Sequence, residues 1–169
     1  GTGDLSELAR ARGARVFGMD FAREMLRGAA GRAIDAHFVQ ADVGALPLRD
    51  GAVSAITCGF ALRNFVSLED AFGEMARVLE PGGRLAILEV DRPRFALARL
   101  GHASSFDRIV PQLGALLSDR KAYAYLPQST AYLPEPGELS ALLEKAGFGQ
   151  LRKRSFLLGS AQLLTGERG

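Results

Sequence analysis

Two glycines and one acidic residue at the start of the chain have the types and spacing needed to bind a nucleotide. Gly1 and Gly3 form a Gly-x-Gly turn that precedes a helical pattern over 4–10, and an apolar run over 15–19 then ends on Asp20. Glycines let backbone N–H groups approach a ligand at a helix N-terminus, and an acid at the end of the next strand can bind ribose hydroxyls. These residues predict a nucleotide site at the end of a parallel strand.

The ligand class depends on what surrounds the glycines. A nicotinamide dinucleotide site usually has Gly or Ala three positions after the second glycine, for close packing of helix on strand. This position holds Ser6, which is small but is neither of the two. Asp4 would also repel a diphosphate, whereas S-adenosylmethionine (SAM) has none. The pattern therefore favours SAM. The alternative is that the glycines only form a tight surface turn.

The composition limits the classes of protein and of partner. A chain of 169 residues suits one domain over 1–169, and 21 basic against 19 acidic residues gives no reason to expect a nucleic acid partner. Cys58 is the only cysteine, which excludes an internal disulfide and fits a reducing, cytoplasmic setting. Two histidines without metal-ligand spacing argue against a metal site. No run of apolar residues approaches the roughly 20 that a membrane span needs, and no signal peptide opens the chain.

The elements that must position these residues alternate between strand and helix. We expect strands over 15–20, 36–41, 52–58 and 84–90, helices over 21–27, 68–79 and 137–148, and a closing hairpin over 150–157 and 160–166. This order predicts an α/β fold with a doubly wound, mostly parallel, Rossmann-like sheet and a C-terminal antiparallel hairpin. The run over 52–58 is apolar and β-branched, which is typical of a buried parallel strand.

The first strand of such a sheet should lie between 15–20 and 52–58, and no strand precedes Gly1. We therefore expect two central strand edges without a partner, either because the chain is a fragment or because another segment supplies the strand. The cofactor half should cover about 1–90, and a helical substrate cap about 92–137.

Six motifs give the chain a family likeness. They are Gly-Thr-Gly-Asp at 1–4, Gly-Met-Asp-Phe-Ala-Arg-Glu-Met-Leu at 18–26, Gln-Ala-Asp with Ala-Leu-Pro-Leu over 40–48, Gly-Phe-Ala-Leu-Arg-Asn-Phe at 59–65, Arg-Val-Leu-Glu-Pro-Gly-Gly-Arg-Leu at 77–85 and Leu-Glu-Val-Asp-Arg-Pro at 88–93. Together they resemble the ubiquinone/menaquinone biosynthesis C-methyltransferases, which are class I SAM-dependent enzymes. The likeness runs from Gly1 to about Gly166 and lacks roughly the first quarter of the family's length.

The resemblance implies a set of cofactor-binding residues. Gly1 and Gly3 would lie under the methionine part of SAM, with Met19 and Asp20 at the ribose and Asp42 and Val43 at the adenine. The alternative for Asp42 is an ordinary loop or helix-capping acid.

The resemblance also implies catalytic and substrate-binding residues. Arg63 would stabilise a phenolate oxygen of the acceptor, Asn64 would hold that oxygen in register, and a water or a tyrosine would take the ring proton. Tyr125 and Ser129 would line the substrate pocket. The alternative for Arg63 is a structural ion pair at a strand end, and Glu89 could either face the cleft or be structural.

The expected acceptor is a prenylated quinol, either demethylmenaquinol or a ubiquinone precursor. Arginines and apolar residues over 92–121 could also rest on an anionic membrane surface, and a homo-oligomer is compatible with the sequence. The alternatives are a methyltransferase for another small phenolic or lipid acceptor, a non-catalytic truncated homologue, and a nicotinamide-dependent reductase.

Overall fold

A computed structural model describes residues 1–91, 134 and 137–169 of the chain. Its helices are α1 (Asp4–Arg10), α2 (Arg23–Ala30), α3 (Leu68–Val78) and α5 (Glu138–Lys145), with short 3₁₀ turns η1 (Leu62–Asn64) and η4 (Leu157–Gly159). Its strands are β1 (Phe17–Asp20), β2 (His37–Gln40), β3 (Val53–Gly59), β4 (Leu79–Val90), β5 (Phe148–Phe156) and β6 (Ala161–Arg168). The predicted helical cap over 92–137 lies almost wholly outside the described residues.

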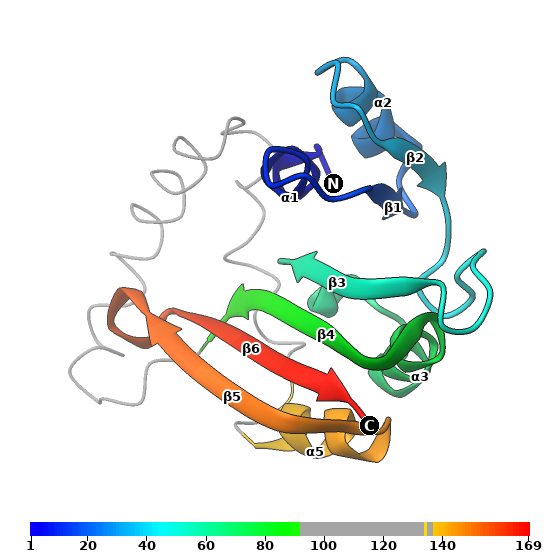
Figure 1. The fold of residues 1–169 in the computed structure, drawn as a ribbon. Coiled ribbons are helices and arrows are strands. Elements are labelled where there is room, and N and C mark those ends of the chain that lie inside the picture. The colour runs from blue at the N-terminus through cyan, green and yellow to red at the C-terminus, as the bar shows by residue number, and fades with distance from the viewer. Residues whose placement is uncertain (92–133, 135–136) are drawn as a thin grey trace.

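The described strands form two sheets rather than one (Figure 1). The smaller sheet contains β1 and β2, which are parallel. The larger sheet has the order β3-β4-β6-β5, in which β3 and β4 are parallel and β6 is antiparallel to both of its neighbours. Within the described part of the chain, β1 pairs only with β2 and β3 pairs only with β4, so one edge of each of these two strands has no partner strand. The predicted parallel strands, terminal hairpin and central break are therefore present.

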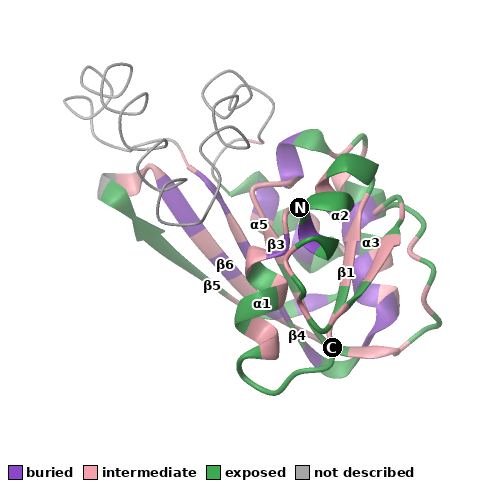
Figure 2. Ribbon diagram, turned by 90° about the horizontal axis from the view of Figure 1, so that it is seen from above, coloured by how far each residue is buried: buried purple, intermediate pink, exposed green. Residues whose placement is uncertain are grey.

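The core lies between the larger sheet and the two helices α3 and α5. Phe72 of α3, Ile87 of β4, Leu143 of α5 and Leu164 of β6 belong to one buried cluster. Ser67 caps α3, because its side chain accepts the Asp70 N–H at 3.1 Å and so satisfies a free amide of the first turn. Figure 2 shows the buried residues concentrated on β4, β6 and α3, whereas β5 and α1 are mostly exposed or half-buried.

Three expectations about the elements were wrong in detail. Ser54, Ala55 and Thr57 of β3 are exposed, although the run over 52–58 was expected to be buried. The cause is that β3 pairs on one edge only and borders the gap between the sheets. α2 begins at Arg23 instead of Phe21, and β4 begins at Leu79 instead of Arg84, with an irregular register near Val53.

Across the described residues, no helix is long and apolar enough to cross a membrane.

Candidate functional site

The glycine turn is shaped by close packing against the segment that follows α2. Gly3 has a φ of +93°, and a Cβ there would lie 2.7 Å from Ile34 Cδ1. An L-residue at position 3 would therefore be strained and would also clash. Arg32 holds the same turn, because its Nη1 donates to the Thr2 carbonyl at 3.1 Å and pairs with Asp4 Oδ1 at 2.5 Å.

The Arg32–Asp4 pair weakens the expected repulsion between Asp4 and a diphosphate. The carboxylate of Asp4 raises the pKa of Arg32, mainly through this hydrogen bond. Part of the Asp4 charge is therefore compensated, so its repulsion of a diphosphate is weaker than expected. The preference for SAM over a dinucleotide therefore rests more on Ser6.

Asp20 lies at the end of β1 and faces the glycine turn, as predicted. Its Oδ1 accepts the Ala22 N–H at 2.8 Å, and its Oδ2 pairs with the N-terminal ammonium of Gly1. The side chain is 27% exposed, so it is open to a ligand from one side. A charged acceptor in this position suits the two hydroxyls of a ribose. Met19, which precedes Asp20, is half-buried.

Asp42 and Val43 lie just beyond the end of β2. Asp42 is exposed, and its Oδ1 accepts the Gly44 N–H at 2.9 Å in a local turn. Val43 is partly buried against the core cluster. Asp42 therefore has the geometry of a loop acid, which is the alternative considered from the sequence. Its Oδ1 is used in the turn, and its exposed side chain leaves Oδ2 accessible to a ligand.

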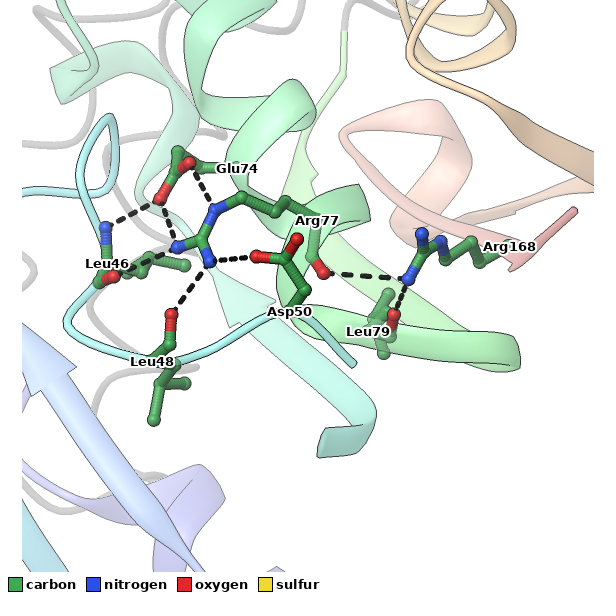
Figure 3. A network of polar contacts seen from close by, with 7 residues as sticks. All are labelled: Leu46, Leu48, Asp50, Glu74, Arg77, Leu79 and Arg168. Carbon is green, nitrogen blue, oxygen red and sulfur yellow. Dashed lines mark hydrogen bonds and ion pairs between the residues drawn. The ribbon is translucent and has the colours of Figure 1, made fainter. Parts of the chain in front are cut away.

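The loop after Val43 is fixed from outside by Arg77 of α3 (Figure 3). The Arg77 guanidinium donates to the carbonyls of Leu46 and Leu48 at 3.1 and 2.8 Å and pairs with Asp50 at 2.7 Å. It also bonds both carboxylate oxygens of Glu74, which lowers the pKa of Glu74 below its ordinary value, and Glu74 accepts the Leu46 N–H at 2.8 Å. One side chain thus sets the path of the loop that begins at Asp42.

Arg63 and Asn64 lie in η1, the single turn that follows β3. Arg63 is buried, and its Nη1 donates to Glu89 Oε1 at 2.9 Å in an ion pair whose side chains are 1% and 0% exposed. Asn64 is exposed, and its backbone N–H donates to the Ala61 carbonyl at 2.9 Å. The turn therefore presents Asn64 outward and holds Arg63 beneath it. The pairing of Arg63 is the structural alternative foreseen from sequence, and it leaves a catalytic role of Arg63 as a prediction.

The end of β3 at Gly59 leads into the η1 turn and lies against α1, the helix that follows the glycine turn. Burial raises the pKa of the Cys58 thiol to about 12. The negative charges of Glu89 and Asp20 act on this thiol in the same direction, and the Gly1 ammonium acts in the opposite direction. Leu5 of α1, the helix that follows the glycine turn, lies against the end of β3, because a Cβ on Gly59 would be 3.1 Å from Leu5 Cδ1. The glycine turn, with Asp20 beside it, and the η1 turn are thus close to one another.

Sequence reasoning missed several polar residues at the same end of β4. Gln162 is buried and its Nε2 donates to the Val90 carbonyl at 3.1 Å, and Lys153 Nζ pairs with Asp91 at 2.7 Å. The two residues of each pair are far apart in the sequence, so no local sequence pattern indicates either contact. Tyr125 and Ser129 lie outside the described residues. Among the residues that the structure describes, no cluster of His, Cys, Asp or Glu could hold a metal ion.

The ubiE/COQ5 methyltransferase family matches residues 1–168. Two relatives bear the name demethylmenaquinone methyltransferase. The one from Thermus thermophilus is 43% identical, with 99% of this chain and 79% of the relative covered. The one from Roseiflexus castenholzii is 44% identical, with 98% of this chain and 72% of the relative covered.

Solved structures show the same fold at low sequence identity. A SAM-dependent methyltransferase from Mesorhizobium loti has a TM-score of 0.70 and 17% identity, with 99% of this chain and 87% of that chain covered. The Rossmann-like α/β fold, the SAM-dependent methyltransferase class and the family resemblance that the sequence predicted are thereby confirmed.

Proposed function

Because the chain belongs to the ubiE/COQ5 methyltransferase family, we propose that it transfers a methyl group from SAM to a ring carbon of a prenylated quinol. Demethylmenaquinol is the preferred acceptor in this proposal, since two relatives at 43% and 44% identity are both named demethylmenaquinone methyltransferases. The observation that carries the proposal is the approach of the glycine turn, with Asp20 beside it, to the end of β3, where the η1 turn exposes Asn64.

The residues present fit SAM, whose sulfonium supplies an electrophilic methyl group. Asp20 would accept hydrogen bonds from the ribose hydroxyls, because its Oδ2 faces the glycine turn and its side chain is partly exposed. Gly1 and Gly3 would lie under the methionine part, with Met19 beside the ribose. Asp42 and Val43 would contact the adenine from the loop that Arg77 fixes.

The acceptor side of the site is assigned to the η1 turn. Asn64 would hold the quinol oxygen, because its side chain is exposed at the end of the sheet. Arg63 would stabilise the developing phenolate, although the ion pair with Glu89 shares its charge. Tyr125 and Ser129 are also assigned to this half of the site, on the resemblance alone. Correct placement of the ring carbon supplies much of the acceleration in such a transfer.

The bonds and charges of the step balance without a further reactant. The ring carbon forms a bond to the methyl carbon as the sulfur–methyl bond breaks, and the sulfur keeps that electron pair. The ring proton then leaves to water, and the aromatic ring is restored. Arg63 is not cast as the base, because a guanidinium remains protonated.

A prenyl tail lies in a bilayer, so the proposal includes contact with the inner face of a membrane. The basis is the set of arginines and apolar residues over 92–121. Salt-sensitive co-sedimentation with vesicles that contain anionic lipid is the expected result, and its absence would remove this part. A homo-oligomer is also retained as a proposal, to be tested by light scattering.

The experiment that tests the function is methyl transfer from isotopically labelled SAM, with the product identified by mass spectrometry. The acceptors are demethylmenaquinol, a ubiquinone precursor and a panel of small phenols. We expect methylation of demethylmenaquinol on carbon, a large loss in Asn64→Ala, and no change in Gln150→Ala, which removes an exposed amide from β5. Methylation of a simple phenol in preference to both quinols would overturn the proposed acceptor.

A further inference from the structure

Glu89, near the end of β4, is a fully buried carboxylate with several donors around it. Its Oε2 accepts the Leu62 N–H at 3.0 Å, and its Oε1 accepts both the Val90 N–H and Arg63 Nη1, each at 2.9 Å. Two of these three donors belong to the η1 turn. The side chain of Glu89 is 0% exposed, so it does not contact a ligand directly.

Stability alone gives no reason for a charged pair in this position. Burial of a carboxylate is costly and raises the pKa of Glu89, while the hydrogen bonds and Arg63 act against that shift. Well-packed apolar residues in place of a buried ion pair often give equal or greater stability. What an apolar pair would not supply is a directional hold on the turn, and both contacts of Glu89 with η1 are directional.

Leu62 anchors the η1 turn in the core, but few backbone hydrogen bonds fix the direction of the turn. It is a single 3₁₀ turn, and its first N–H, that of Leu62, has no partner within the turn and is satisfied by Glu89 instead. Phe60, just before the turn, has a φ of +53°, which is strained for an aromatic residue. Local strain of this kind persists only where the surroundings impose it.

We propose that Glu89 is a positioning residue, which fixes the η1 turn by binding the Leu62 N–H and the Arg63 guanidinium and thereby sets the place of Asn64. The proposal rests on the proposed function for the meaning of that place, since Asn64 is the residue assigned to the quinol oxygen. Glu89 then acts through the turn and does not contact the reactants.

Asn64 offers a direct readout of this proposal, because it is the only asparagine in the chain. Protein labelled with [¹⁵N]asparagine alone reports its backbone amide, whose hydrogen bond to the Ala61 carbonyl closes the turn. In Glu89→Gln we expect a shifted or broadened Asn64 signal and at least a tenfold faster hydrogen exchange. The control is Asp91→Asn, which removes an ion pair two residues further along, and it should leave the signal and the exchange rate unchanged.

Kinetics separate positioning from a general structural role. In Glu89→Gln we expect kcat with demethylmenaquinol to fall 10- to 100-fold, while the affinity for S-adenosylhomocysteine changes by less than threefold. A purely structural residue would lower the melting temperature or the folded fraction and leave kcat per folded site unchanged, and that result would overturn the proposal. An unchanged Asn64 exchange rate would also overturn it. Absence of methyl transfer in the parent chain, with the expected exchange change in Glu89→Gln, would refute the proposed function and support the positioning role.

Discussion

Replacement of Arg63 by methionine tests how far the fold depends on the buried ion pair. The side chains of Arg63 and Glu89 are 1% and 0% exposed and joined at 2.9 Å, so the variant leaves the Glu89 carboxylate buried without the guanidinium. Loss of one partner from a buried pair costs about 3–5 kcal/mol of unfolding free energy. For a domain of this size, each kcal/mol corresponds to roughly 2–4 °C, so we expect the melting temperature to fall by roughly 6–20 °C.

The loss should depend on pH in a defined direction. Burial already raises the pKa of Glu89 in the folded protein, and removal of Arg63 will raise it further. A carboxyl group with a raised folded pKa destabilises the protein at pH values above that pKa, where the charged form must be buried. The cost vanishes as the pH falls toward the unfolded pKa of about 4.3, because both states are then protonated. The deficit of Arg63→Met should therefore be largest at neutral pH and smaller at pH 5.

The assay is urea unfolding followed by circular dichroism at pH 7.5 and pH 5. The companion variant is Arg63→Met/Glu89→Gln, which removes the charge but keeps an acceptor for the Leu62 N–H. We expect it to regain most of the stability that Arg63→Met loses. A loss below about 1 kcal/mol in Arg63→Met, where removal of a partner should cost about 3–5, would refute the reasoning. So would an equal loss at both pH values, or a double variant less stable than Arg63→Met.

Three further predictions concern other parts of the described structure. Glu74→Gln should speed hydrogen exchange of the Leu46 amide, because it removes the charged acceptor of that N–H. In the parent, the same protection should be lost as the pH falls through the lowered pKa of Glu74. Unchanged exchange in the variant would show that Arg77 fixes the loop by itself. Cys58 should resist iodoacetamide at pH 8 in the folded chain and react rapidly in urea, because desolvation raises the pKa of its thiol to about 12. Comparable rates in the two states, measured by mass spectrometry, would contradict the raised pKa. Phe72→Ala should cost about 3–5 kcal/mol in urea unfolding, since Phe72 is 0% exposed, and a cost below about 1 kcal/mol would place it outside the core.

Local patterns were sufficient to predict most of the elements and the placement of Asp20 beside the glycine turn. The Gly-x-Gly turn and the acid at the end of a short strand are contiguous signals, and the structure places Asp20 beside Gly1 as expected. The serine before α3 is another local signal, because a capping side chain bonds amides only a few residues away. The unpaired edges of β1 and β3 were also expected from the order of the elements.

The remaining features depend on contacts between distant segments. Arg63 and Glu89 are 26 residues apart, and the sequence around neither residue indicates that the two will form a buried pair. The exposure of β3 likewise follows from its unpaired edge and not from its apolar composition. Asp4 was expected to carry an uncompensated charge, but its partner Arg32 lies 28 residues away.

The measurement that most directly tests the account is calorimetric titration of S-adenosylhomocysteine into the chain and into Asp20→Ala. Asp35→Ala is the matched control, because it also removes an ion-paired carboxylate, on a side chain that is 88% exposed and pairs with Arg10. Loss of charged hydrogen bonds worth about 1.5–3 kcal/mol predicts at least a tenfold weaker affinity in Asp20→Ala and no change in Asp35→Ala. Equal affinity in all three proteins, or no binding to the parent, would contradict the assignment of this site to SAM.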